Sequence, residues 1–220
     1  EVDLVDDDPS RIELDPVPLP VALAMWRADP AAGLTRAAEF VPARRAQLAA
    51  DLAFLDQLAT DLALAENQPQ IATVISELQG SGLLPQRPGR AKITRPTQEL
   101  LRLYTVNGVE IIVGRNARQN DHITFGVANA SDLWLHARDV PGAHVVIRSG
   151  GQPVDKETLQ AAAQLAAYYS QRRGDGAVAV AMTSRRFVTR VPGGRPGQVH
   201  VRQEEIITVP ATMPAELMNK

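Results

Sequence analysis

The amino-acid sequence predicts an α+β protein, in which a helical hairpin precedes a mixed, largely antiparallel β domain with about two helices. From about Leu34 to Glu66 the chain is rich in alanine, leucine, glutamine and arginine, which all favour helix. In the second half, short apolar runs alternate with turn residues, and Asn107-Gly108 between two such runs indicates a β-hairpin. Few crossover helices separate these runs, so a doubly wound parallel sheet is not expected.

An extended lead-in is predicted at residues 1–18, which are acidic and rich in proline. A short strand at Arg11–Leu14 is compatible with the prolines that follow it. A first helical patch, Val21–Ala28, ends near Pro30. Because the first residues contain no Met and no signal-peptide layout, we expect the chain to be a fragment of a longer protein.

Residues 19–84 are predicted to form a helical hairpin of the coiled-coil type. Pro69 is placed to open the second arm at its first turn, and glycines 80 and 82 stop that arm. We expect an a/d seam on the first arm to pack against the apolar stripe Ile71–Leu78, as a unit separate from the C-terminal domain. The residues of the seam are Leu48, Leu52, Leu55, Ala59 and Leu62. The residues that widen its apolar face are Phe54, Leu58 and Leu64.

A linker is predicted at residues 85–98, which contain three prolines and four basic residues. Residues 99–215 then form the β domain, opening with a type I′ turn at Asn107-Gly108. A short helix is expected to start near Asn120 or Asp121, and Asp155 is a candidate N-cap for a longer one. The remaining strands are predicted within the runs DLWLHAR, AHVVIRS, AVAVAMT, RFVTRV, QVHVR and IITV.

Composition narrows the classes of function. The absence of cysteine excludes disulfides and thiolate metal ligands and suits a reducing cytoplasm. No run of about 18 apolar residues is present to span a membrane. The net charge of −2 hides an asymmetry, because residues 1–97 carry nine basic and 14 acidic residues while residues 98–220 carry 14 and 11. A basic region confined to one domain favours an anionic partner such as RNA, with an ordinary solvated arginine surface as the alternative.

The stretch Asp132–Arg148 contains the residue types that a reactive or metal-binding site needs. His136, Asp139 and His144 are possible metal ligands, but their spacing matches no helical ligand pair and no second carboxylate lies close by. The chain also has no Walker loop, no GxSxG and no GxGxxG. We therefore expect no catalytic residue, no metal site and no cofactor, and predict a binding surface instead.

The face that this stretch presents depends on the length of its loop. A five-residue connection at 139–143 would pair residue 138 with 144 and residue 134 with 148, because side chains alternate between the two faces of a strand. The candidate RNA-binding residues that then share one face are Trp134, His136, Arg138, His144 and Arg148. A four-residue loop would send His144 and Arg148 to the other face, and burial of Trp134 is a further alternative. The residues expected to fix the loop are Asp139, Pro141 and Gly142.

Arginines dominate the segment from residue 172 to residue 202, where seven stand against the single acid Asp175. Cations contact phosphates, and an aromatic ring beside them can stack on a base. The arginines of this segment that we expect to contact RNA are Arg172, Arg173, Arg185, Arg186, Arg190 and Arg195.

The runs D-L-W-L-H, D-V-P-G and H-V-V-I within Asp132–Arg148 resemble the signature of the NFACT family, in particular its RNA-binding domain. The resemblance extends through Gly114–Asp121, Glu157–Arg173 and the run FVTRVPGGRPGQVHV. Upstream, Ile12–Pro16 and Ile71–Leu84 resemble the boundary and the second arm of the family's coiled coil. The family's coiled coil is usually longer, and lysines common near the last run are Arg190 and Arg195 here, which keeps the charge and changes the geometry.

The resemblance implies a part in ribosome-associated quality control. Members of the family bind stalled large ribosomal subunits and tRNA and support C-terminal tailing of nascent chains, with alanine in bacteria, through residues of an N-terminal domain expected upstream of this chain. The expected partners are therefore rRNA of the large subunit and tRNA, in the cytoplasm and with no membrane. Some bacterial members are also labelled fibronectin-binding proteins, so binding to the extracellular matrix is the alternative, and a metal-dependent hydrolase or nuclease is a third hypothesis.

Overall fold

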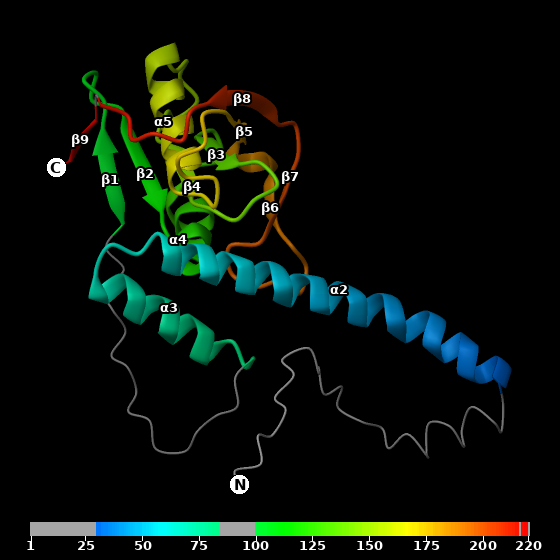
Figure 1. Cartoon of the computed structure of the whole chain (residues 1–220). Coiled ribbons are helices and arrows are strands. Elements are labelled where there is room, and N and C mark those ends of the chain that lie inside the picture. Colours follow the sequence, from blue (N-terminus) through cyan, green and yellow to red (C-terminus); the bar gives the residue numbers. More distant parts are fainter. Residues whose placement is uncertain (1–29, 84–99, 216, 220) are drawn as a thin grey trace, which may run out of the picture. The chain divides into compact units, whose positions relative to one another are not determined.

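The structure is a computed structural model that describes residues 30–83, 100–215 and 217–219 (Figure 1). The chain divides into two compact units, residues 1–49 and 50–220. Four of the expected segments lie outside the described residues: the lead-in 1–18, the strand at Arg11–Leu14, the helical patch Val21–Ala28 and the linker 85–98. Their boundaries remain predictions.

Two helices precede the β domain, α2 at Pro30–Ala63 and α3 at Gln68–Gly80, which confirms the predicted helical hairpin. Asn67 caps α3, since its side-chain oxygen accepts a hydrogen bond of 3.1 Å from the backbone N–H of Gln70. Pro69 lies in the first turn, where its missing N–H has no intrahelical partner to lose. The start of the second arm therefore agrees with the prediction from Pro69, and Asn67 adds the N-cap.

The predicted a/d seam of α2 is wrong. Its exposed members include Leu52, Leu55 and Leu62, at 61%, 39% and 50% of their surface. Among the residues of α2 whose burial is described, the buried apolar ones are instead Phe54 and Leu58, which pack with Val74 of α3 and Ala117 of the β domain. Because α2 packs on α3 and on the β domain at the same time, the expectation of a hairpin separate from that domain is also wrong.

Hydrogen bonds attach the second half of α2 to the β domain. The guanidinium group of Arg195 binds one carboxylate oxygen of Asp51 at 2.6 and 2.9 Å and donates to the backbone oxygen of Ser81 at 3.0 Å. The side-chain amide of Gln198 donates to the backbone oxygen of Ala50 at 2.9 Å. These contacts lie within residues 50–220, so this compact unit begins inside α2.

A seven-stranded sheet in the order β8-β5-β3-β4-β2-β1-β9 forms the centre of the β domain, and all its pairs are antiparallel (Figure 1). Its strands are β1 Leu101–Tyr104, β2 Glu110–Gly114, β3 Leu133–Ala137, β4 His144–Ile147, β5 Val178–Ser184, β8 Glu205–Val209 and β9 Met218–Asn219. A separate antiparallel pair joins β6 Val188–Arg190 to β7 Val199–Val201. The α+β prediction is confirmed, and β9 is a strand that the sequence analysis did not predict.

The β1–β2 hairpin forms where Asn107-Gly108 predicted it, but the type I′ turn is wrong. That turn needs positive φ at both central residues, whereas Gly108 has φ 77° and Asn107 is not among the residues with positive φ. The backbone N–H of Thr105 donates to the oxygen of Val109 at 3.0 Å, so three residues form the loop. Three-residue hairpin loops of this kind place a glycine in the left-handed region at their last position.

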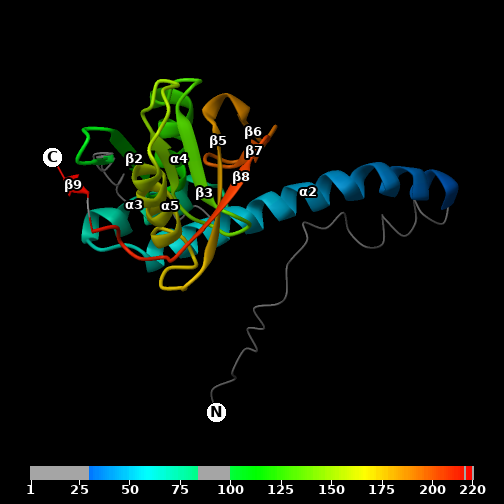
Figure 2. The same cartoon turned by 90° about the horizontal axis from the view of Figure 1, so that it is seen from above.

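Helix α5, Lys156–Tyr168, covers one face of the sheet (Figure 2). The predicted cap is confirmed, because the carboxylate of Asp155 accepts a 2.7 Å hydrogen bond from the backbone N–H of Thr158. Ala162 and Ala166 of this helix are fully buried in one apolar cluster with Leu135 and Val145 of the central strands. Small side chains at these positions let the helix lie close to the sheet.

The opposite face is covered by α4, Ala117–His122, by the π-helical turn η1, Ile123–Val127, and by the β6–β7 pair. Helix α4 begins three residues before the predicted start at Asn120, because the side chain of Asn116 caps it by accepting from the N–H of Gln119 at 2.8 Å. The buried residues of this side are Ile112, Ile123, Trp134, Val146 and Val188. The sheet therefore has an apolar core on each face.

Replacing Phe54 by Ala is expected to lower the free energy of unfolding by about 3 kcal/mol or more, the usual cost of deleting a buried aromatic side chain. The neighbouring change Leu55→Ala should cost less than about 1 kcal/mol, since Leu55 is 39% exposed. Urea unfolding of the two variants measures both values. A larger loss for Leu55→Ala would contradict the packing and restore the a/d seam.

Candidate nucleic-acid interface

The strands β3 and β4 pair two residues away from the predicted register. Trp134 lies opposite Val146, and Leu135 lies opposite Val145, whereas the prediction paired Trp134 with Arg148. A shift of two residues leaves every side chain on its predicted face. Trp134, His136 and His144 accordingly meet on one face, where their rings lie 4.9–5.7 Å apart between centroids.

The loop between β3 and β4 is fixed mainly through Gly142. Its N–H donates to the side-chain oxygen of Gln57 at 3.1 Å, and its oxygen accepts from the side-chain amide of Asn120 at 3.0 Å. A Cβ at residue 142 would lie 2.8 Å from the Cβ of Ser170, so only glycine fits this approach. Asp139 instead has 88% of its side chain exposed and contacts Arg138 at 3.5 Å. Its φ of 57° marks the bend of the loop.

The expectation that Trp134 and His144 are on an exposed RNA-binding face is wrong. Their exposed fractions are 1% and 2%, and residues of η1 and of the β6–β7 pair pack against Trp134. The indole N–H of Trp134 donates to the hydroxyl of Thr124 at 3.2 Å, and the same hydroxyl lies 2.8 Å from Nδ1 of His144. The backbone N–H of His144 donates to the side-chain oxygen of Asn120 at 2.9 Å. These hydrogen bonds make both rings part of the core.

His136 lies in the wall of a cavity of about 550 Å³, together with Arg138, Phe54 of α2 and residues of β7. Burial lowers the pKa of the His136 imidazole to about 4. Burial also holds the pKa of His144 well below its usual value, and the neighbouring His136 adds to this effect. Both rings are therefore neutral near pH 7, and His136 can offer a neutral ring or a hydrogen bond but not a positive charge.

The structure does not gather His136, Asp139 and His144 into a metal site. Among the described residues there is no group of three or more histidine, aspartate or glutamate side chains that could hold a metal ion. Asp139 is exposed and lies beside Arg138.

Two arginines converge on Phe125 of η1. The guanidinium carbons of Arg190 and Arg185 lie 3.9 and 5.0 Å from the ring centroid. Arg190 is 57% exposed and binds both carboxylate oxygens of Asp121 at 2.9 Å. Arg185 donates to the backbone oxygen of Thr124 at 2.6 Å. These contacts fix the orientation of both guanidinium groups, and we call Phe125, Arg185 and Arg190 the Phe125 cluster.

The other predicted arginines lie elsewhere and differ in how much of their charge is available. Arg186 is exposed, lies 4.8 Å over the ring of Phe187, and has no carboxylate within 4.0 Å among the residues that the structure describes. Arg172 pairs with Asp175 at 2.8 Å, and Arg173 stacks on Tyr168 at 3.9 Å.

Three more of the predicted arginines serve contacts within the chain. Arg138 lies 3.5 Å from Glu204 as well as from Asp139. Arg148 binds the buried carboxylate of Asp132 at 3.1 Å and donates to the oxygen of Val127 at 3.0 Å. Arg195 is held by Asp51, as described above. Arg148 and Arg195 therefore have structural roles and little free charge.

Sequence reasoning missed Thr124, Asn120 and Phe125. The run ITFGV offers an aromatic residue beside a hydroxyl in a basic domain, which is a weak signal for a polar or stacking contact. Nothing local indicates its partners, because Arg185 lies 61 residues away from Thr124. These residues come together only in the folded domain, where the β6–β7 pair packs on η1.

The two histidines are expected to make the fold sensitive to mild acid. Since each folded pKa lies below the ordinary 6.5, the unfolded chain binds more protons between about pH 6.5 and pH 4, and stability falls as the pH drops through this window. His136→Gln removes one of these contributions. Between about pH 7.5 and 5.5 the variant should gain about 1.4 kcal/mol relative to the unmodified chain in urea unfolding. A difference that does not change with pH would contradict the lowered pKa of His136.

Comparisons with known proteins show which family this chain resembles. Residues 100–203 match the family model described as NFACT protein RNA binding domain. The chain is 36% identical over 161 residues to the Rqc2 homolog RqcH of Bacillus subtilis, across 72% of this chain and 28% of that protein. It is also 36% identical over 161 residues to the Rqc2 homolog RqcH of Streptococcus suis, across 73% and 29%. The chain thus spans under a third of these relatives.

A solved structure has the same fold. It is the C-terminal part of the fibronectin/fibrinogen-binding protein from Streptococcus suis, with a TM-score of 0.72 and 32% identity, and the match covers 81% of this chain and 71% of that chain. At this identity and coverage, the likeness includes the helical segment as well as the β domain. The chain belongs to the NFACT family, and residues 100–203 are its RNA-binding domain.

Proposed function

We propose that this chain is the RNA- and ribosome-binding module of a ribosome-associated quality-control factor. The observation that carries the proposal is the match of residues 100–203 to the RNA-binding domain of the NFACT proteins. The relatives named Rqc2 homolog RqcH support the role in ribosome quality control. The task of the chain is binding, with no catalytic step assigned to it.

Within this role we assign two partners to the chain, rRNA of the large ribosomal subunit and tRNA, in the cytoplasm. Support for C-terminal alanine tailing of nascent chains is a task of the whole factor, since the chain spans 28% and 29% of its two relatives. Within that factor, we assign RNA binding to this chain. Across the described helices, none has both the length and the apolar character needed to cross a membrane.

The Phe125 cluster and Arg186 are the surface that we assign to RNA. Arg185 and Arg190 stack on one ring while their contacts to Thr124 and Asp121 fix the guanidinium planes, so the N–H groups that remain free have defined directions. Planar, fixed guanidinium groups suit phosphate oxygens, and an arginine plane or an aromatic ring can stack on an unpaired base. Arg138, Arg172 and Arg173 are exposed and belong to the same proposal as secondary contacts.

A second candidate function is binding to the extracellular matrix. It is favoured by the solved relative, which is part of a fibronectin/fibrinogen-binding protein. Cosedimentation of the chain with purified large ribosomal subunits, in competition with soluble fibronectin, separates the two. Retention on the subunits in the presence of fibronectin supports the first function, and release by fibronectin with no dependence on RNA supports the second.

Salt should govern the binding of single-stranded RNA. If Arg185 and Arg186 each neutralise one phosphate, the double change Arg185→Ala and Arg186→Ala should make the slope of log K against log salt less negative by about 1.4, at about 0.7 per contact. Fluorescence anisotropy of a labelled RNA at several salt concentrations measures the slope. The control is Arg102→Ala, an arginine on β1 that is 43% exposed and pairs with Glu110. An unchanged slope in the double variant, or an equal change in the control, would contradict the assignment.

A further inference from the structure

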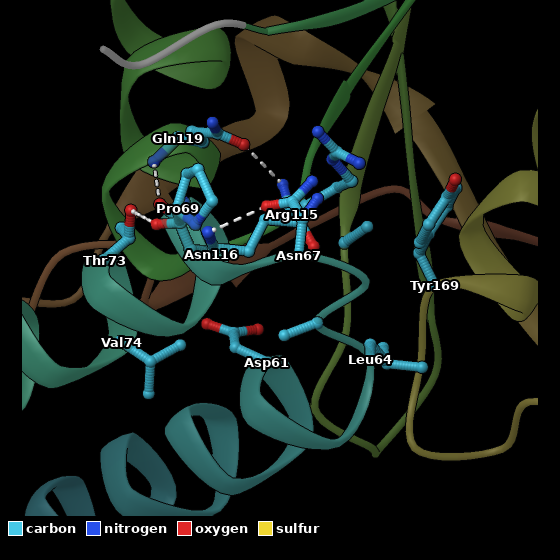
Figure 3. Close-up of a pocket in the computed structure, with 13 residues that line it drawn as sticks. Asp61, Leu64, Asn67, Pro69, Thr73, Val74, Arg115, Asn116, Gln119 and Tyr169 are labelled. Atoms are coloured by element: carbon cyan, nitrogen blue, oxygen red, sulfur yellow. Dashed lines mark hydrogen bonds between the residues drawn. The ribbon is translucent and has the colours of Figure 1, made fainter. Parts of the chain in front are cut away.

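A cavity of about 230 Å³ lies between the end of α2, α3, the turn from β2 to α4, and the end of α5 (Figure 3). Its polar lining comes mainly from Asp61 of α2, Thr73 of α3, and Arg115 and Asn116 of the turn. Its apolar lining includes Leu64, Val74 and Ala143. The cavity is smaller than the roughly 300–1,000 Å³ of sites for drug-sized ligands, so it suits a compact molecule.

Most polar groups around this cavity already bind one another. The N–H of Arg115 donates to the side-chain oxygen of Gln119 at 2.9 Å, and the N–H of Gln119 donates to the side-chain oxygen of Asn116 at 2.8 Å (Figure 3). The hydroxyl of Thr73 donates to the backbone oxygen of Pro69 at 2.9 Å. These bonds fix the walls of the cavity before any ligand arrives.

Two polar atoms of the lining have no hydrogen-bond partner although they are buried, Oδ2 of Asp61 and Nε of Arg115. Asp61 is 6% exposed, and its other oxygen accepts a 2.7 Å hydrogen bond from the side chain of Gln57. In Figure 3 its carboxyl group extends from α2 toward Asn67 and Asn116. Buried polar groups are nearly always satisfied in native proteins, so two such atoms of opposite charge in one cavity point to a missing partner.

We propose that this cavity binds a small α-amino acid, whose ammonium group donates to Asp61 and whose carboxylate accepts from Arg115. A zwitterion satisfies both atoms at once. A simple anion would leave the Asp61 carboxyl group without a cationic partner, and a simple cation would be repelled by the Arg115 guanidinium group and leave it without an acceptor. The apolar lining leaves room for a short side chain.

The electrostatics of Asp61 agree with an ammonium partner. Burial, with a smaller contribution from the neighbouring carboxyl group of Glu77, raises the pKa of its carboxyl group to about 8. Without a cation the group is mostly protonated near pH 7, and its Oδ2 has no partner. An ammonium group beside it would stabilise the ionised carboxylate and give Oδ2 its hydrogen bond.

The site is independent of the proposed RNA surface. None of its lining residues belongs to the Phe125 cluster, and Arg186 is not among them. The inference therefore goes beyond RNA binding, and either proposal can fail while the other holds.

Thermal unfolding with single added compounds tests the site on the whole chain. The probes are glycine, L-valine and L-tryptophan as zwitterions of increasing size, with ethylamine and acetate as the two halves of the recognition group. At about 100 times the dissociation constant, glycine or L-valine should raise the melting temperature by about 5–10 °C, with a smaller effect of L-tryptophan and none of the half-probes. Asp61→Asn and Arg115→Gln should each abolish the rise.

Matched controls carry the same chemical changes outside the cavity. Asp56→Asn on α2 and Arg102→Gln on β1 should keep the full response, because neither residue lines the cavity. If the Asp61→Asn variant does not fold, the melting-temperature response of Arg115→Gln alone tests the proposal. The proposal is overturned if no amino acid raises the melting temperature, if acetate or ethylamine alone raises it equally, or if the rise survives in the folded Asp61 and Arg115 variants.

Discussion

The side-chain amide of Asn120 is the contact on which the arrangement of the β domain depends. Its nitrogen donates to the oxygen of Gly142 at 3.0 Å, and its oxygen accepts from the N–H of His144 at 2.9 Å. The amide is 1% exposed, and a Cβ at Gly114 would lie 2.6 Å from its oxygen, so strand β2 must have a glycine there. One residue of α4 thereby holds the β3–β4 loop, the start of β4 and the end of β2 in a single geometry.

Two consequences for function follow from this contact. With Gly142 held in place, its N–H reaches Gln57, which fixes the second half of α2 on the domain together with the Arg195–Asp51 pair. With His144 held in place, η1 packs over the indole ring and places Phe125 beside Arg185 and Arg190. The aromatic residues of the family signature therefore build the core, and a different aromatic residue supports the basic surface.

Local features of the chain predicted the fold well. The alternation of side chains placed Trp134, His136 and His144 on one face of the sheet, and the short polar side chain of Asp155 predicted the start of α5, because both depend on neighbours in sequence. Burial of Trp134 was one of two alternatives that the sequence left open, since its cover comes partly from Val188, 54 positions along the chain. The predicted a/d seam of α2 is wrong for the same reason. Residues distant in sequence, Val74 and Ala117, pack against Phe54 and not against Leu55.

The central claim is that RNA binds to the Phe125 cluster and Arg186. It does not bind against the rings of Trp134, His136 and His144. Ultraviolet crosslinking of the chain to RNA, with crosslinked residues identified by mass spectrometry, tests it directly because aromatic side chains in contact with bases are the ones that crosslink. The account predicts crosslinks at Phe125 and Phe187, both of which are partly exposed beside arginines. Crosslinks at Trp134, with none at Phe125 or Phe187, would contradict it.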